Sequence, residues 1–190
     1  MKKMKKYSLL ILITILVGLA PDAIAQGKYF TRDGFISFFS STPVEDIKAN
    51  NPKVTCVIDA SSGAIEMAVL MKAFEFKKAL MEEHFNENYV ESEKYPKATF
   101  KGNIVNFKDI DFTKDGIYPS IVKGSMTIHG VTKEMEAEGS IEIKEGRVIL
   151  NSTFNIKPED YDIEIPSVVR DKIAEQMLIT LKASLDPFNR

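Results

Sequence analysis

Apolar and polar residues alternate along most of the chain. From Met177 to Leu185 every second residue is apolar, and most residues between them are polar or small. Successive side chains of a β-strand point to opposite faces, so this period of two predicts a strand with one buried face. The same period recurs over residues 53–59, 64–71 and 147–156.

Further segments rich in β-branched and aromatic residues predict strands at about 34–41, 97–107, 117–128 and 131–144. Short polar stretches such as "SSG" after Ala60 and "KEG" after Ile143 are typical of hairpin turns. Seven or eight such strands predict an all-β antiparallel meander. Eight strands that close on themselves would leave no exposed edge and a narrow interior.

One segment has a helical period. In residues 73–85, Phe76, Leu80 and His84 recur every fourth position, with Met81 and Phe85 beside them. This spacing predicts one amphipathic helix that lies over an end of the sheet. A second short helical turn is expected to begin at Pro166, because proline suits a first helical position.

The apolar faces of the predicted strands define the expected interior. Its methionine and phenylalanine side chains adapt well to a flexible hydrocarbon chain. The same residues would also be expected if the barrel were filled by its own side chains. The pattern therefore leaves open whether the interior is a ligand cavity or a packed core. The residues expected to face inward are Ile36, Phe38, Cys56, Ile58, Met67, Val69, Phe100, Val122, Met126, Ile128, Phe154, Ile179 and Leu181.

The first 25 residues have the layout of a secretory signal peptide. A basic start, "MKKMKK", precedes a twelve-residue apolar run and the small-residue site "AIA". Twelve apolar residues are too few to span a bilayer, which takes about 20. We therefore expect cleavage between Ala25 and Gln26, an exported mature domain of residues 26–190 and no membrane span after cleavage. An uncleaved N-terminal anchor is the alternative.

Charge and cysteine content narrow the function further. Without residues 1–25 the chain has 21 basic and 26 acidic side chains, a net charge of −5. This sign disfavours nucleic acid and anionic membrane surfaces as partners. Cys56 is the only cysteine, so no internal disulfide forms, and its place on the apolar face of a strand predicts a buried, unreactive thiol.

Neither histidine has the sequence context of a metal ligand or a catalytic base. His84 and His129 are far apart, one cysteine cannot complete a zinc site, and no nucleotide-binding or nucleophile motif occurs, so we expect no metal and no cofactor. "DIDFTKDG" lacks the downstream glutamate of an EF-hand and favours a turn. His84 is either a packed helix residue or a donor to a ligand head group at the mouth.

The segment "KGSMTIHGVTKEMEAEGSIEI" (123–143) predicts two strands that reverse at "HGVTK". Beyond the reversal Met135 and Ala137 share one face, whereas Glu134, Glu136 and Glu138 share the other. The glutamates are thus expected to face solvent, and His129 is expected in the turn rather than in a catalytic site.

Two segments resemble the YceI-like family. "GSMTIHGVTKEMEAEGSI" resembles its "GdLTIHGvTkpv" segment, and "ESEKYPKATFKGNI" (91–104) is similar to its "yP.atF.s..i" segment. The resemblance extends over the mature chain. It implies a secreted or periplasmic, lipocalin-like antiparallel barrel of eight strands that holds a long isoprenoid or another lipid in its apolar bore.

The chain also departs from that family pattern. The usual "RD.HL" stretch before the helix is replaced by "FKKALMEEHFNENY", in which only His84 has a counterpart, and the region 40–52 is shorter than the usual first hairpin. Three functions stay open: a non-catalytic lipid carrier in the bacterial envelope, a filled barrel acting as an adaptor or stress protein, and an enzyme on a lipid that uses His84 and a carboxylate. The oligomeric state is not predicted.

Overall fold

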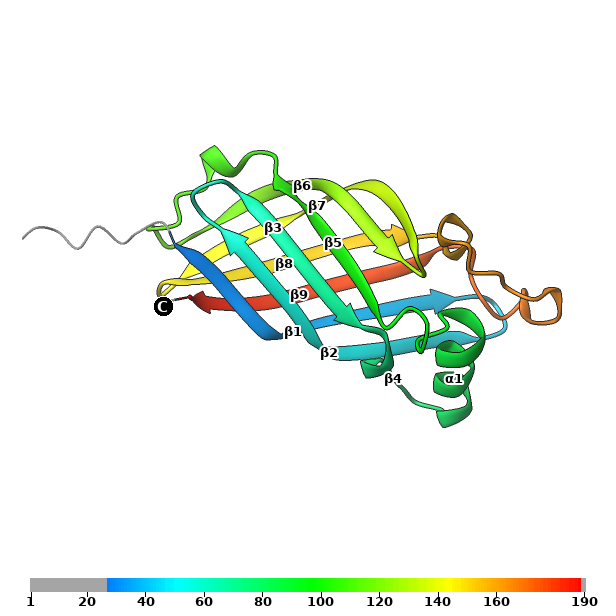
Figure 1. Cartoon of the computed structure of the whole chain (residues 1–190). Helices are drawn as coiled ribbons and strands as arrows, with labels where there is room; N and C mark the ends of the chain where they lie inside the picture. Colours follow the sequence, from blue (N-terminus) through cyan, green and yellow to red (C-terminus); the bar gives the residue numbers. More distant parts are fainter. Residues whose placement is uncertain (1–26, 189–190) are drawn as a thin grey trace, which may run out of the picture.

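The computed structural model describes residues 27–188, so the predicted signal peptide lies outside the described residues. Its main feature is a closed barrel of eight antiparallel strands (Figure 1). Each strand pairs with the next along the chain, and β9 returns to pair with β1, which confirms the predicted meander and its closure. The strands are β1 (Lys28–Ser41), β2 (Asp46–Asp59), β3 (Ala64–Leu70), β5 (Lys97–Ile104), β6 (Gly116–Ile128), β7 (Val131–Lys144), β8 (Arg147–Ile156) and β9 (Met177–Pro187).

The first two strands begin earlier than their sequence pattern predicts, because each contains an irregularity that interrupts the alternation. In β1 the register shifts between Thr31 and Ile36. In β2 the buried Asn51 side chain donates a 2.8 Å hydrogen bond to the Leu70 carbonyl and accepts one of 2.9 Å from the Lys53 amide. A bulge of this kind moves the inward positions by one residue.

Two glycines allow β5 and β6 to approach closely. Gly102 and Gly124 are direct partners in the ladder. A Cβ atom on Gly124 would lie 2.2 Å from the Lys101 carbonyl oxygen, and one on Gly102 would lie 2.3 Å from the Lys123 carbonyl oxygen. A side chain at either position would collide with the backbone of the other strand, so only glycine fits at both.

The predicted helix over 73–85 is displaced toward the C-terminus. Residues 71–73 form the short turn η1 (Met71–Ala73), and β4 (Glu75–Phe76) pairs with Ala49 and Asn50 of β2. The helix α1 (Ala79–His84) follows and continues as η2 (Phe85–Tyr89), which is wound as a π-helix. The prediction was wrong for the first half of the segment, because pairing with β2 outweighs the local helical period.

One half of the barrel interior is filled by side chains. Its core contains the fully buried Ile58, Ile104 and Val148 and is closed by Ile110 and Phe112. Ile110 follows η3 (Phe107–Asp109) and Phe112 lies in the turn after it, so the "DIDFTKDG" segment forms an end cap of the barrel. The Phe112 ring stacks on Tyr29 with centroids 6.0 Å apart.

The two remaining short turns lie between β8 and β9. They are η4 (Pro158–Tyr161) and η5 (Ser167–Val169), and the latter follows Pro166 as predicted. Figure 1 shows both turns at the same end of the barrel as α1. No helix within residues 27–188 is long and apolar enough to cross a membrane.

Candidate ligand-binding cavity

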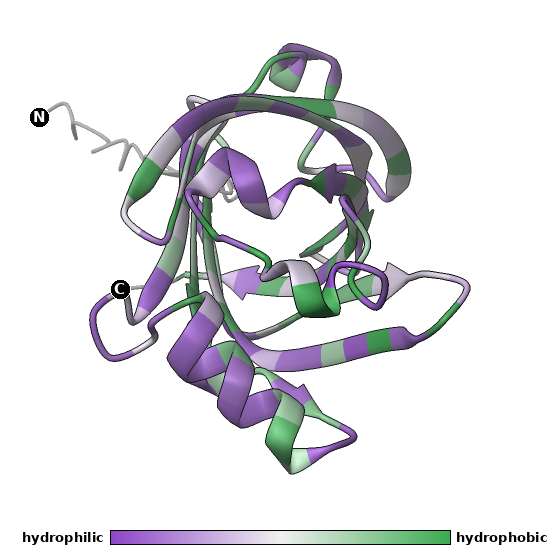
Figure 2. Ribbon diagram, turned by 90° about the vertical axis from the view of Figure 1, so that its right-hand side faces the viewer, coloured by the Kyte–Doolittle hydropathy of each residue, from purple (hydrophilic) through white to green (hydrophobic). Residues whose placement is uncertain are grey.

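The other half of the barrel encloses a cavity of about 620 Å³. Seen from that end, the strands form a ring with the connecting turns in front of the opening and α1 beside it (Figure 2). The floor of the cavity is formed by Ile65, Ile141 and Leu150, which also belong to the packed core. A volume of this size is typical of sites for small organic ligands, which span about 300–1,000 Å³.

Eleven of the 13 residues predicted to face inward line this cavity. Cys56 and Ile58 also face the interior, but they lie in the packed half, where neighbouring side chains cover them completely. The period of two identifies the inward face but not the depth at which packing gives way to a cavity. The eleven residues that line the cavity are Ile36, Phe38, Met67, Val69, Phe100, Val122, Met126, Ile128, Phe154, Ile179 and Leu181.

The buried position of Cys56 explains its chemistry. Its side chain has no exposed surface, and burial raises the pKa of the thiol to about 12. The thiolate is the reactive form of cysteine, so this group is unreactive at neutral pH. The prediction of a buried, inert thiol is therefore confirmed.

Four phenylalanines form an aromatic cluster on one wall near the opening: Phe38 of β1, Phe74, Phe76 of β4 and Phe85 of η2. Phe85 is in contact with the other three rings, at centroid distances of 5.1–5.6 Å. Of these four residues, the strand pattern predicted only Phe38 to face the interior. The tertiary structure brings the others to it because β4 pairs with β2 and carries α1 to the barrel rim.

The connection between β8 and β9, residues 157–176, supplies a second wall that the sequence analysis did not predict. We call it the strap. Its side chains Tyr161, Ile163, Ile165, Val169 and Ile173 line the cavity. The strap is fastened to β1 by the Ala174 amide, which donates a 2.9 Å hydrogen bond to the buried Ser40 hydroxyl. Isolated isoleucines and valines in a polar segment are the sequence signal for this role.

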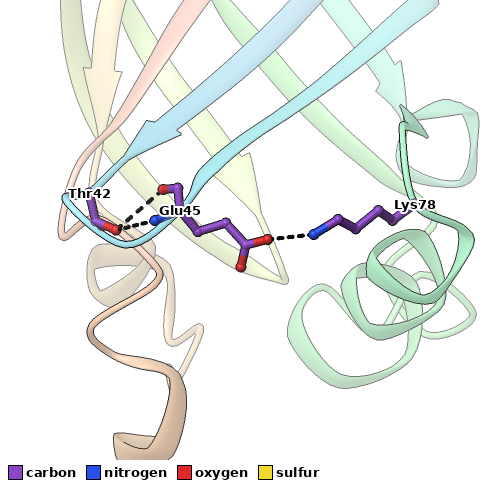
Figure 3. Close-up of polar contacts among 3 residues, drawn as sticks. All are labelled: Thr42, Glu45 and Lys78. Atoms are coloured by element: carbon purple, nitrogen blue, oxygen red, sulfur yellow. Dashed lines mark hydrogen bonds and ion pairs between the residues drawn. The ribbon is translucent and has the colours of Figure 1, made fainter.

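Two charged residues of the lining, Glu45 and Lys78, form a pair at the rim. The Glu45 carboxylate in the β1–β2 turn forms an ion pair with the Lys78 ammonium group, 2.7 Å away, and Lys78 directly precedes α1 (Figure 3). The turn itself is held by Thr42, whose hydroxyl oxygen accepts hydrogen bonds of 3.2 and 3.1 Å from the amides of Val44 and Glu45. The Glu45–Lys78 ion pair therefore joins two rim segments that are distant in sequence.

His84 also lines the cavity, but its side chain is largely exposed on α1. None of the hydrogen bonds or ion pairs among residues 27–188 involves its ring. His129 lies in the β6–β7 turn as predicted and is the histidine that contacts a carboxylate, that of Glu91 at 2.8 Å. That pair lies outside the cavity lining. Across the described range, no three His, Cys, Asp or Glu side chains are grouped to hold a metal ion.

Three glutamates of β7 face solvent, as their alternation with apolar residues predicted. Glu134, Glu136 and Glu138 are exposed, and Glu136 forms a 3.3 Å ion pair with Lys123 of β6. Met135 and Ala137 between them line the cavity. Glu134 and Glu136 are therefore separated from the cavity by the barrel wall, whereas Glu138, also exposed, belongs to the residues that border the cavity.

Comparison with known protein families gives one match that covers most of the chain. The YceI-like domain model matches residues 31–185. A comparison with curated protein sequences gave no significant match.

Solved structures share the fold at low sequence identity. A polyisoprenoid-binding domain from Saccharophagus degradans superposes with a TM-score of 0.75 at 13% identity, covering 86% of this chain and 99% of that domain. Burkholderia cenocepacia BcnA gives 0.66 at 14% identity, covering 80% and 95% of the two chains. The Campylobacter jejuni YceI protein gives 0.51 at 14% identity, covering 98% and 100%.

Proposed function

The chain belongs to the YceI-like family, and from this premise we propose that it is a non-catalytic carrier of a long-chain, isoprenoid-like lipid in the bacterial periplasm or envelope. The observation that supports this function best is the cavity of about 620 Å³ between the packed core and the rim. An adaptor filled by its own side chains would have no use for such a cavity. The Saccharophagus degradans domain of the same fold is described as polyisoprenoid-binding.

The lining has the composition that such a ligand needs. Met67, Met126 and Met135 offer flexible, polarisable side chains along the wall, and the phenylalanine cluster offers flat apolar surface near the opening. Burial of hydrocarbon contributes about 25 cal/mol per Å² of apolar surface, so a lipid chain would be retained without any charged contact.

Three of the charged lining residues lie in the rim and the strap, where we place the head group, and the fourth, Glu138 of β7, has an exposed side chain. Glu45 and Lys78 pair at the rim, and Lys172 of the strap also lines the cavity. His84 is the exposed histidine on the same side, and we propose it as an additional head-group contact. The export expected from residues 1–25 would bring the domain to the envelope, where isoprenoid lipids are available in the membranes.

An extraction experiment tests the proposal. The mature protein, purified without detergent, is analysed by native mass spectrometry, and an organic extract is examined for long-chain apolar molecules. We expect a co-purifying lipid, and displacement of a fluorescent prenyl probe by a long-chain prenol. Repeated lipid-free extracts together with no probe binding would overturn the proposed function.

A further inference from the structure

His129 occupies a backbone position where its side chain is an unusual choice. It is the first residue of the two-residue turn between β6 and β7, with φ of 51°, followed by Gly130 with φ of 79°. Turns with two positive φ values favour Asn-Gly. Histidine tolerates this conformation better than most residues, but it brings a large ring to a hairpin tip.

The ring is held by two separate segments. Its Nδ1 lies 3.1 Å from the Tyr161 carbonyl oxygen at the end of η4, and its Nε2 lies 2.8 Å from Glu91 Oε2, in the loop after η2. The Tyr95 ring packs edge-on against it, with centroids 4.5 Å apart. A Cβ atom on Gly130 would lie 2.6 Å from Tyr95, so glycine there permits the contact. The imidazole is 12% exposed.

Both partners of the ring accept hydrogen bonds. A backbone carbonyl has no proton to donate, and neither has an ionised carboxylate, whereas a neutral imidazole carries a single N–H. Only the doubly protonated ring satisfies both contacts. The hydrogen bond from His129 is the main cause that lowers the pKa of Glu91, and the charge of Lys94, 3.7 Å from Glu91, acts in the same direction.

Tyr161, the partner of His129 on the strap, connects the His129–Glu91 pair to the cavity. The Tyr161 side chain lines the cavity, and its carbonyl is bonded to His129. The strap has a further contact with the same hairpin in the ion pair of Asp160 with Lys133 at 3.7 Å, and its other end is fastened by Ser40. The groups that face His129 from the packed elements are therefore Glu91, Lys94, Tyr95, Asp160 and Tyr161, with Lys133 on its own hairpin.

We propose that the His129–Glu91 pair is a catch that holds the strap over the cavity mouth while His129 is protonated and Glu91 is ionised, and that its release lets ligand exchange. The catch regulates the site of the proposed function and rests on it for the identity of what is released. A neutral His129 ring carries a single N–H, so one of its two contacts with acceptors is lost and the strap loosens. In acid the catch is lost again as the pH falls through the lowered pKa of Glu91.

The test measures the strap directly. Amide hydrogen exchange of residues 158–176, corrected for the intrinsic pH dependence of exchange, is compared at about pH 5.5 and about pH 8.5 in the protein without lipid. We expect opening of the strap to increase about tenfold at the higher pH, since a hydrogen bond between charged groups is lost. Release of a bound fluorescent prenyl probe should accelerate in parallel.

Three variants test whether the His129–Glu91 pair causes the pH dependence of strap opening. In Glu91→Gln the amide N–H can donate to the unprotonated Nε2 of a neutral His129, so the strap should be protected equally at both pH values. His129→Gln should also remove the pH dependence. His84→Gln changes the other histidine and should leave the pH dependence of strap exchange intact in the protein without lipid. Because His84 is the proposed head-group contact, this control is not applied to probe release. Thermal melts establish that each variant is folded.

The outcomes separate the catch from the carrier function. Strap protection that is independent of pH in the unchanged protein, or a pH dependence that survives Glu91→Gln, would overturn the catch even if lipid binds. A pH-dependent strap in a protein that binds no lipid would support the catch and leave the proposed function contradicted.

Discussion

At the scale of single residues, neighbours in sequence have opposite environments. Met67 of β3 lines the cavity between Cys56 and Phe100, its partners in the ladder, whereas the adjacent Glu66 faces solvent and forms a 3.4 Å ion pair with Lys101. The position of each side chain relative to the barrel wall therefore determines the effect of a substitution, as the following pair shows.

Met67→Glu places a charge among apolar groups that offer it no partner. We expect the free energy of unfolding to fall by roughly 3–5 kcal/mol, or probe binding to be lost if the carboxyl becomes protonated. Glu66→Met is the matched control and should change stability by less than about 1 kcal/mol, since exposed ion pairs contribute little. Denaturant titration and probe binding measure both. A tolerated Met67→Glu with normal binding would contradict the inward assignment of β3.

Cys56 should make stability depend on alkaline pH. Its pKa is raised to about 12 in the folded protein by burial. The thiol of the unfolded chain ionises near its ordinary pKa of 9.0, so the stabilisation that comes from burying the neutral thiol is complete below that pH and is lost progressively up to about pH 12. The slope is about 1.4 kcal/mol per pH unit in this window.

The control is Cys56→Ala, which retains all tyrosines and removes only the thiol. We expect its unfolding free energy, measured in denaturant from about pH 8 to about pH 10.5, to fall less steeply than that of the unchanged protein. Identical slopes would show that the thiol is accessible to solvent in the folded state.

At the scale of elements, the barrel wall and its rim depend on a few close contacts between strands and turns. Gly102 and Gly124 set the approach of β5 to β6. The ion pair of Glu45 with Lys78 joins the β1–β2 turn to the segment before α1. Each contact can be disturbed by one substitution that leaves the adjoining sequence unchanged.

Gly124→Ala should destabilise the barrel by at least about 2 kcal/mol. Its methyl group would lie 2.2 Å from the Lys101 carbonyl oxygen, and backbone atoms of β5 would have to move. Gly146→Ala in the β7–β8 turn is the control, because no atom lies within 4 Å of its Cβ and only the positive φ of 76° opposes it, at a cost of about 1 kcal/mol. Thermal unfolding compares the stability of the two variants. An equal loss of stability in both would contradict the close approach of β5 and β6 at Gly124.

Lys78→Glu should open one side of the rim. Repulsion from Glu45 replaces the 2.7 Å ion pair, and we expect release of a bound prenyl probe to accelerate about two- to fivefold, consistent with the strength of a partly exposed pair. The double exchange Glu45→Lys with Lys78→Glu should restore the original rate. Lys101→Glu disrupts an outer-wall pair and is the control. Equal rates of probe release in all variants would show that the Glu45–Lys78 ion pair does not affect ligand exchange.

At the scale of the whole molecule, the barrel combines a packed half and an open half. The packed half contains fully buried aliphatic side chains and an end cap, so we expect it to be stable without any guest. The open half is bordered by the strap, the phenylalanine cluster and the rim. If the proposed ligand binds in the open half, its entry and exit should not disrupt the core.

Removal of the ligand should therefore leave the barrel folded. We expect protein emptied by organic extraction and refolding to retain its strand content by circular dichroism and to unfold cooperatively. Addition of ligand at 100 times its dissociation constant should raise the free energy of unfolding by about 2.7 kcal/mol through mass action. Loss of cooperative unfolding in the emptied protein would show that the guest is part of the core.

Local patterning determined which residues form strands and which face turns inward, because side-chain alternation is a property of each strand alone. The meander of eight strands, the exposed glutamates of β7, the turn at His129 and eleven cavity-lining residues could all be predicted in this way. Closure of the ring was expected from the family resemblance and from the need to avoid free edges.

Tertiary structure alone decided where packing ends and the cavity begins. Cys56 and Ile58 alternate like the lining residues, yet the end cap of Ile110 and Phe112 fills the space on their side. Pairing of Phe76 with Ala49 shortened the predicted helix, and the strap reached the cavity through contacts with Ser40 and His129. These outcomes depend on residues far apart in sequence, because the volume left inside a barrel is set by what all its strands and connections place there together.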